Sequence, residues 1–397
     1  MPFINKTKLR HLLLPDQYTS EAQYEDEMKR LLLPAWHLVA TTHDLPNPGD
    51  YLTFELLRQP VLLRNMGGEL RAFLNVCAHR HSRLMKDARG SSERLRCQYH
   101  GWEYNAEGRT GRIPNAQCFR PFDRKNACLQ QFRVATCGQL VFVALTPNGP
   151  TLEEYLGPLY AGWRESFDAP FRFAGSWEGE FDCNWKVVVE NALEDYHVPL
   201  VHPKSFRMYA EEEQCSHVLT DRYTTYTRAI KNGDTRFGRA ANWLIRWMGG
   251  TRTNGTYEHQ IIHPHLMLAA ADIVRTATIV DALSPTTCRF RMYCFTLRGE
   301  RNNPAAQLVG WLLRVFMVAL GKRVFREDAS IYAEIQRGLA ASPFRGVIGT
   351  REERVFAFQQ FVSQGCPRSE RPPADSDLED PSALLRSPPL LPSPMPA

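Results

Sequence analysis

The stretch that decides the fold runs from Cys77-Ala-His79 to Cys97-Gln-Tyr-His100. It has the pattern C-x-H-x17-C-x2-H, so two short loops each offer one cysteine and one histidine. Zinc also takes two cysteines with two histidines, but its usual spacing places both cysteines in one loop and both histidines in the other. The pattern therefore favours a metal centre to which each loop gives one ligand of each kind.

A Rieske [2Fe–2S] cluster has this requirement, because two cysteines hold one of its irons and two histidines hold the other. We therefore predict such a cluster at Cys77, His79, Cys97 and His100. The plainer alternative, two free cysteines with two surface histidines, accounts neither for the spacing nor for the glycine that follows His100. A cluster of this kind carries electrons, so the rest of the chain is expected to contain their destination.

Length and composition limit the possible classes of protein. The chain has 397 residues, enough for two or three domains, and its formal net charge of +5 gives no case for nucleic acid as a partner. We expect no signal peptide, because the N-terminal residues contain no apolar run long enough for one. We also expect no membrane span, because the most apolar segment, Leu308–Leu320, is interrupted by Arg314 and is short. That segment is predicted to be a buried helix. The 10 cysteines are scattered, which indicates reduced thiols and a cytoplasmic protein.

Changes in sequence texture predict four parts of the chain. Residues 1–35 contain a helix that is expected to pack on the later, catalytic part, and residues 36–148 have the short alternating runs of a small antiparallel β domain. Residues 149–366 alternate strands with long helices, so the chain as a whole reads as α+β. Residues 367–397 are rich in proline and serine and are predicted to be disordered.

A second segment with chemical potential ends in His197-Val-Pro199-Leu-Val-His202. On a continuous helix the two histidines would lie about 140° apart. Pro199 disfavours helix at Val198 and begins a turn, which would bring His202 back toward His197. Two imidazoles beside acidic residues suit a site with two histidines and one carboxylate for non-haem iron(II), which leaves positions open for oxygen and substrate.

The missing carboxylate need not be local, and Asp328 is the best candidate. Two helices are predicted, over residues 304–321 and 329–340, and Asp328 stands at the head of the second, on the same face as Ile331 and Ile335. The alternative role of Asp328 is to cap that helix. Ordinary core or surface histidines remain the alternative for the other two ligands, so each half of the site depends on the other.

Three motifs together resemble the Rieske non-haem iron oxygenases, the catalytic α subunits of aromatic-ring-hydroxylating dioxygenases and related monooxygenases and demethylases. They are C-x-H-x17-C-x2-H, Glu-Asn-x2-Glu-x-Tyr-His-x4-His and Glu-Asp-x2-Ile-x3-Gln-Arg-Gly-Leu. The resemblance covers about residues 20–365. It implies an N-terminal all-β Rieske domain and a C-terminal helix-grip (START-like) domain, an antiparallel sheet with helices that holds mononuclear iron.

Carried over by position, the resemblance implies two sets of metal ligands. The [2Fe–2S] cluster would be held by Cys77, Cys97, His79 and His100, and the mononuclear Fe(II) by His197, His202 and Asp328. Family members are commonly homotrimers that receive electrons from NAD(P)H through a separate reductase, with or without a ferredoxin. The implied reaction inserts oxygen from O2 into a small organic substrate.

Two further residues are implied to act in catalysis. Glu194 falls where the family places a carboxylate between a neighbouring subunit's Rieske histidine and a histidine of the iron site, although many relatives have aspartate there. Helix geometry also favours Glu194 over Asp195 as the partner of His197, because residues three apart share a face. Asn191 matches an asparagine that recurs near the iron. A departure from the family is His81, where a glycine is usual, and it is expected to be a surface group and no ligand.

The substrate is less constrained. An apolar pocket is expected from residues 205–300 and the helix 304–320, which favours hydroxylation or dihydroxylation of an aromatic or apolar ring. The alternative within the family is a quaternary-amine monooxygenase or an O/N-demethylase, since Glu194 resembles some of those enzymes. A cation would need an aromatic cage, and Trp243, Trp247 and Tyr257 are candidates if they are not core residues. A Rieske electron carrier fused to a ligand-binding domain is the non-enzyme alternative, and a zinc protein is the third.

Overall fold

The computed structural model describes residues 9–203, 205, 211, 214–229, 236–249, 255–298 and 303–367. The chain divides into two compact units, one of residues 32–169 and one of residues 1–31 with 170–397. The division therefore falls later than the boundary predicted at residue 148. Apart from Pro367, the tail predicted over residues 367–397 lies outside the described residues.

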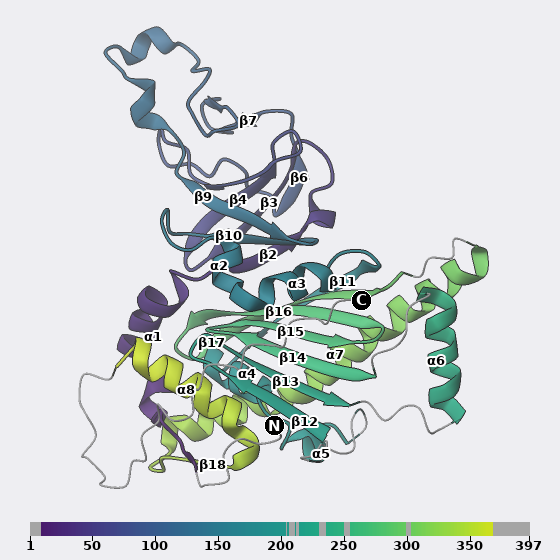
Figure 1. Cartoon of the computed structure of the whole chain (residues 1–397). Coiled ribbons are helices and arrows are strands. Elements are labelled where there is room, and N and C mark those ends of the chain that lie inside the picture. Colours follow the sequence, from purple (N-terminus) through teal and green to yellow (C-terminus); the bar gives the residue numbers. More distant parts are fainter. Residues whose placement is uncertain are drawn as a thin grey trace, which may run out of the picture. The chain divides into compact units, whose positions relative to one another are not determined.

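The first unit is built on one antiparallel sheet in the order β2-β10-β9-β5-β4-β3-β6 (Figure 1). The strands are β2 His37–Thr41, β3 Asp50–Leu56, β4 Gln59–Asn65, β5 Leu70–Leu74, β6 Arg89–Ser91, β9 Gln131–Cys137 and β10 Leu140–Ala144. A separate short ladder pairs β7 Leu95–Arg96 with β8 Glu103–Tyr104. Strand β10 is buried along its whole length, as expected for a continuous apolar run. The predicted small antiparallel β domain is confirmed.

Two helices, α2 Leu152–Leu156 and α3 Tyr160–Ser166, explain why the first unit extends past the predicted boundary at residue 148. Thr151 caps α2 by accepting from the Glu154 backbone, as a capping box requires. Beyond α3, the carbonyl of Phe167 accepts a hydrogen bond from the backbone N–H of Gln139, at 2.9 Å. These contacts join the segment to the edge of the first sheet, so it belongs to the β unit and not to the next one.

The second unit contains an antiparallel sheet in the order β11-β17-β16-β15-β14-β13-β12 (Figure 1). Its strands are β11 Phe171–Phe181, β12 Cys215–Leu219, β13 Tyr223–Ala229, β14 Thr256–Ile262, β15 Leu266–Ala271, β16 Val274–Ser284 and β17 Thr287–Leu297. Its helices are α1 Glu21–Glu27, α4 Trp185–Ala192, α5 Val198–Val201, α6 Arg236–Gly249, α7 Pro304–Ala341 and α8 Glu353–Gly365. A short ladder of β1 Leu9–Arg10 with β18 Val347–Ile348 completes the unit. The predicted α+β class is confirmed.

The long helix α7 differs from its prediction. The two helices predicted over residues 304–321 and 329–340 form one helix of 38 residues, because the intervening Lys-Arg-Val-Phe-Arg-Glu contains neither proline nor glycine. Asp328 therefore lies in the middle of a helix, which excludes its alternative role as a cap. Asn303 caps the helix instead, by accepting from the Ala306 backbone at 2.9 Å.

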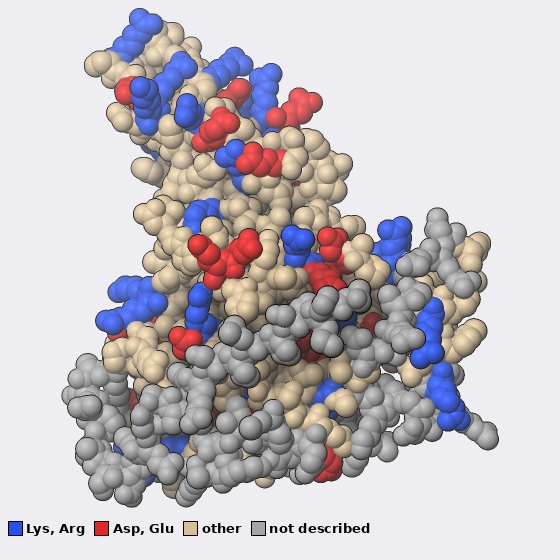
Figure 2. Space-filling view, in the orientation of Figure 1, with Lys and Arg blue, Asp and Glu red and all other residues tan. Residues whose placement is uncertain are grey.

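The predicted burial of Leu308–Leu320 is also wrong. The middle of α7 packs on the sheet, where Val318 lies against Gly175 of β11. The opposite face is exposed, with exposed fractions between 49% and 62% for Leu308, Trp311, Leu312, Val315 and Phe316. Among the described helices, none has the length and hydropathy that a bilayer crossing requires. On the face drawn in Figure 2, Lys and Arg are interspersed with Asp and Glu.

The N-terminal helix α1 is anchored to α4 by a buried ion pair. The Ser20 side chain caps α1 by accepting from the Gln23 backbone. Glu27 at the end of α1 meets the Lys186 ammonium at 2.7 Å, and both side chains are 0% exposed. The indole of Trp185 donates to the same carboxylate at 2.8 Å. The first turn of α4, which leads toward the predicted iron ligands, is therefore fixed by α1.

Candidate metal centres

The two predicted cluster loops have the same backbone construction. In the first, Cys77 N–H donates to Ser82, and the Cys77 carbonyl accepts from His81 at 3.0 Å. In the second, Cys97 N–H donates to Trp102, and the Cys97 carbonyl accepts from Gly101 at 3.1 Å. Each loop therefore makes one tight turn that presents a cysteine and a histidine in equivalent ways.

The matching turns explain the unusual histidine of the first loop. His81 has a φ of 59° and Gly101, its counterpart, has a φ of 71°, a region in which glycine is favoured. A glycine would meet the same need at lower cost. The His81 side chain is exposed, in agreement with its expected surface position.

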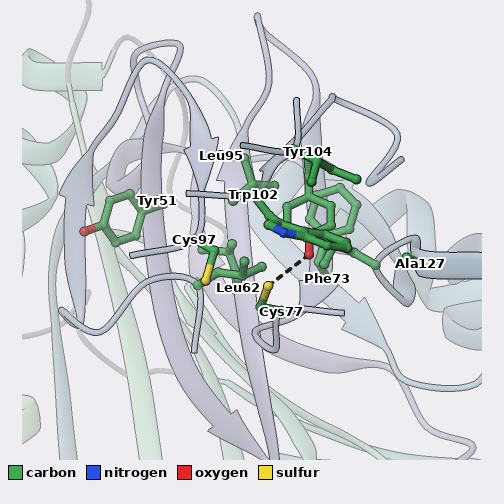
Figure 3. Packing of buried hydrophobic residues seen from close by; sticks show 12 residues of the cluster. Tyr51, Leu62, Phe73, Cys77, Leu95, Cys97, Trp102, Tyr104 and Ala127 are labelled. Carbon is green, nitrogen blue, oxygen red and sulfur yellow. Dashed lines mark hydrogen bonds between the residues drawn. The ribbon is translucent and has the colours of Figure 1, made fainter. Parts of the chain in front are cut away.

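Both cysteines of the predicted ligand set are buried, whereas the two histidines lie nearer the surface. Cys77 and Cys97 are 1% and 2% exposed and belong to a core cluster with Trp102 (Figure 3). The imidazoles of His79 and His100 lie 4.7 Å apart between ring centroids, and His100 is exposed. The Nδ1 atom of His79 is buried and has no hydrogen-bond partner among the described residues. A buried imidazole nitrogen without a partner, close to two buried cysteines, fits a cluster with one iron inside and one near the surface.

Tyr104 of β8 supports the first cysteine. Its hydroxyl oxygen lies 3.1 Å from Cys77 Sγ, a contact drawn in Figure 3, and accepts from the Ala78 backbone at 3.0 Å. Burial raises the pKa of the Cys77 thiol, while the contact with Tyr104 lowers it. Tyr104 was not predicted from the sequence, since nothing in the two-loop pattern identifies it.

The second predicted site forms around the single-turn helix α5. Helix α4 ends at Ala192, so the helix geometry assumed for Glu194 and His197 is wrong. His197 and His202 flank α5, which contains Pro199, and their ring centroids lie 5.4 Å apart. Val198 is the first residue of α5 and is helical, contrary to expectation, but the short helix brings the two imidazoles together as predicted.

Asp328 of α7 completes the triad. One ligand atom from each of His197, His202 and Asp328 lies within 4.8 Å of the others. Asp328 Oδ1 is 2.9 Å from His202 Nε2 and 3.4 Å from His197 Nε2, yet it makes no hydrogen bond of proper geometry among the described residues. Three donors that converge without satisfying one another fit a divalent metal with two nitrogen ligands and one carboxylate.

A carboxylate holds the other nitrogen of each imidazole. His197 Nδ1 contacts Glu194, and His202 Nδ1 lies 2.9 Å from Glu327 Oε2. Burial alone would lower the pKa of His197, but Asp328 and Glu194 raise it to about 9. Both Nε2 atoms consequently face Asp328, the orientation that metal-binding histidines usually receive from such partners. Glu327 was missed, although it directly precedes Asp328 in the Glu-Asp motif.

The remaining predicted residues have separate partners. Asn191 accepts a hydrogen bond from the Tyr332 hydroxyl at 3.1 Å and lines the cavity beside the triad. Among the described residues, Asp195 forms no hydrogen bond or ion pair with the His197 side chain, although the segment is not helical as the prediction assumed. It accepts from the Tyr226 hydroxyl at 3.2 Å and lies 3.4 Å from Arg351 Nε.

The triad opens on a cavity of about 520 Å³. Its aromatic lining consists of Tyr226, Tyr257, Phe290, Phe325 and Tyr332. Of the predicted helix 304–320, only Met317 and Leu320 reach the wall, while α4 and α8 contribute residues that were not predicted. Of the proposed cage residues, Tyr257 lines the cavity, whereas Trp243 is 65% exposed on α6 and Trp247 is not part of the lining.

Comparison with known proteins identifies both halves of the chain. Residues 35–133 match the family model of the Rieske [2Fe-2S] domain, and residues 169–367 match that of the ring hydroxylating alpha subunit (catalytic domain). The carnitine monooxygenase oxygenase subunit of Escherichia coli (strain K12) is 26% identical over 335 residues, 83% of this chain and 84% of that protein. The anthranilate 1,2-dioxygenase large subunit of Acinetobacter baylyi is 32% identical over 196 residues, 47% of this chain and 41% of that protein.

A solved structure agrees with these matches. The structure of a quaternary ammonium Rieske monooxygenase superimposes with a TM-score of 0.72 at 21% identity, covering 89% of this chain and 95% of that one. At this identity the likeness shows a shared fold. Both parts of a Rieske oxygenase are matched by family models, so the zinc protein and the Rieske electron carrier fused to a ligand-binding domain, which the sequence alone left open, are not supported.

Proposed function

The chain belongs to the Rieske oxygenases with a ring-hydroxylating α-subunit catalytic domain, and we propose that it oxidises a substrate bearing a quaternary ammonium group. The family is O2-dependent, carries a Rieske cluster and mononuclear iron, and works with a separate reductase. The cluster would be held by Cys77, Cys97, His79 and His100, and the iron by His197, His202 and Asp328. The convergence of the triad on the cavity wall is the observation that carries the assignment of the active site.

Each part of the site has a stated task in this proposal. Iron(II) with open coordination positions supplies oxygen activation when it is bound there. Glu194 and Glu327 keep the two imidazoles oriented, so that both Nε2 atoms remain available as ligands. The apolar side chains of the cavity exclude water from the reacting carbon. Asn191, held by Tyr332, would fix the position of α4 beside the iron.

Two observations support a quaternary ammonium substrate. The carnitine monooxygenase matches most of this chain, whereas the anthranilate dioxygenase matches less than half. Aromatic faces also surround the cavity, and Tyr226 and Tyr257 lie 6.4 Å apart between centroids. Such faces attract a cation that has no hydrogen-bond donors. The ring substrate favoured by the sequence alone remains the second candidate, because the same lining suits an aromatic ring.

Glu194 is proposed to have a second task. In a homotrimer it would link a neighbouring subunit's cluster histidine to His197 of its own site and so couple the two metal centres for electron transfer. A single chain that turns over as a strict monomer would contradict this part of the proposal.

Product analysis with labelled O2 tests the substrate class. A carbon hydroxylated next to the nitrogen collapses to an aldehyde and a free amine. The enzyme with a reductase is therefore expected to convert trimethylammonium compounds to an amine and a carbonyl product. The amount of O2 consumed should rise in proportion to the amount of product formed. The variant His202→Ala is the matched control and should form neither the amine nor the carbonyl product. Formation of phenols or cis-diols from aromatic rings, with no turnover of trimethylammonium compounds, would select the second candidate.

A further inference from the structure

One wall of the cavity carries a buried arginine held only by neutral groups. Arg354, in the first turn of α8, is 3% exposed and lines the cavity. Its Nε donates to the Thr224 hydroxyl at 3.1 Å, and its Nη2 donates to His259 Nδ1 at 3.1 Å. These two acceptors occupy one edge of the guanidinium. The other edge, formed by Nη1 and Nη2, makes no further hydrogen bond among the described residues.

The acidic residues of the same cavity are already engaged. Glu194 contacts His197, and Asp328 faces both histidines of the triad. Asp195 is paired with Arg351 and accepts from a tyrosine hydroxyl. Within the described part of the chain, Arg354 therefore forms no ion pair, although the charge of Asp195 acts on it through space and raises its pKa.

A second arginine adds to the positive charge of this wall. Arg228 of β13 also lines the cavity, and its guanidinium carbon lies 5.2 Å from the ring centroid of Tyr257. Like Arg354, it forms no ion pair with an acidic side chain among the residues that the structure describes. Two guanidinium groups thus line a largely apolar cavity without a direct ion pair, while the carboxylates of that cavity contact other partners.

Burial makes this arrangement costly. A buried charge destabilises the fold unless it is paired, so an unpaired cation in a binding cavity indicates a missing anionic partner. Burial lowers the pKa of Arg354 to about 10, which still leaves it charged at neutral pH. Burial and the charge of Arg354 together lower the pKa of His217 to about 3 and that of His259 well below its usual value. Both imidazoles stay neutral, so they neither add to nor offset the charge.

We propose that Arg354, assisted by Arg228, binds a carboxylate of the substrate through its open edge. A guanidinium edge and a carboxylate match in a two-point hydrogen-bonded pair. The inference rests on the proposed function and narrows it. The two arginines repel a simple cation, so a quaternary ammonium substrate must be a zwitterion that also carries an acid group. An aromatic substrate of the second candidate class would be a ring carboxylic acid.

Titration of the iron-loaded enzyme without O2 or reductase tests this binding directly. The probes are carnitine, glycine betaine and benzoate, each paired with its methyl ester. The acid is expected to bind on the order of 30-fold more tightly than its ester, the usual worth of a charged hydrogen-bonded pair. Arg354→Gln should remove this preference, and Arg354→Lys should retain part of it. Thr224→Val keeps the charge but removes the acceptor that orients Nε, so a smaller loss is expected.

Arg351→Gln is the matched control from the same cavity. Because Arg351 is already paired with Asp195, its loss should leave the preference for acids intact. Equal binding of acids and esters by the native enzyme, an unchanged preference in Arg354→Gln, or a preference lost only in Arg351→Gln would each overturn the inference. If Arg354→Gln does not fold, as judged by circular dichroism, the preference for the acid over its ester is measured in Arg354→Lys and Thr224→Val instead. An unchanged preference in both variants would overturn the inference.

This outcome is separable from that of the proposed function, because binding requires no turnover. An enzyme that selects acids but yields no oxidised product keeps the carboxylate subsite and refutes the oxygenase substrate class. An enzyme that oxidises choline as readily as glycine betaine keeps the function and refutes the subsite.

Discussion

The two metal centres differ in how much of the chain each requires. The cluster loops, Cys77–His81 and Cys97–Gly101, are neighbours in sequence and share one backbone turn with its own hydrogen bonds. The triad instead joins α5 to Asp328 in the middle of α7, far along the chain. The first centre depends on local geometry, and the second depends on how helices pack across a sheet. Mutations should therefore affect the two centres independently.

Reciprocal removal of ligands gives the largest expected effect. His202→Ala should remove the mononuclear iron and reduce oxygenation to the uncatalysed level, a loss of at least about 10⁶-fold. Its visible spectrum and the electron paramagnetic resonance of the reduced cluster should stay native. Cys97→Ser should abolish those signals and retain one iron. Loss of both centres in either variant would contradict their independence.

The buried ion pair of α1 gives the next effect. Glu27→Ala leaves the Lys186 charge without its partner, which typically costs about 3–5 kcal/mol. Urea unfolding followed by far-ultraviolet circular dichroism should show this loss of stability. The visible absorbance of the cluster should disappear at nearly the same urea concentration as in the native protein. The double variant Glu27→Leu with Lys186→Met removes both charges and should recover most of the stability. A native midpoint for Glu27→Ala would mean that the pair does not anchor α1.

The carboxylate behind His202 gives a smaller effect. Glu327→Gln weakens the support of Nδ1 but leaves all three ligands in place. Iron affinity is expected to fall by about 10–100-fold, as is usual for such outer contacts. Competition with a chelator measures it, and Ser330→Ala, one turn away on the exposed side of α7, is the control. An unchanged affinity would show that Glu327 does not orient His202.

Tyr104→Phe makes the corresponding change at the cluster. Its hydroxyl donates to the Cys77 sulfur once that sulfur is a thiolate, which stabilises the reduced cluster. Loss of one such bond should lower the reduction potential by on the order of 60 mV, the equivalent of a tenfold change for one electron. Redox titration of the visible spectrum checks this, and iron at the triad should be unaffected. A rise in potential would contradict the assigned direction of the hydrogen bond.

The sequence pattern alone identifies more of the proposed ligands at the cluster than at the mononuclear iron site. All four proposed cluster ligands follow from a local pattern, and the positive φ of His81 explains why a glycine would suit that position. The strands of both sheets follow from alternation and turn residues. His197 and His202 were paired through Pro199, while Asp328 required the resemblance to a family as well as its helix face.

Other features could not be predicted because no local signal marks them. The burial of α7 was misjudged, since an apolar run does not reveal which of its faces meets a sheet. Trp243 was considered for a cage because its residue type is suitable, yet it lies outside the cavity lining. Arg354 and Thr224 are distant in sequence, and only the fold brings the Thr224 hydroxyl against the guanidinium of Arg354.

Iron content per chain tests the central claim most directly. The native protein and Asp328→Ala should be purified side by side, loaded with iron without O2, and assayed for iron and acid-labile sulfide. We predict three irons in the native chain and two in the variant, with two sulfides in each, because a [2Fe–2S] cluster accounts for two of the irons. Two irons in the native chain, or three in Asp328→Ala, would contradict the assignment of His197, His202 and Asp328 as the mononuclear site.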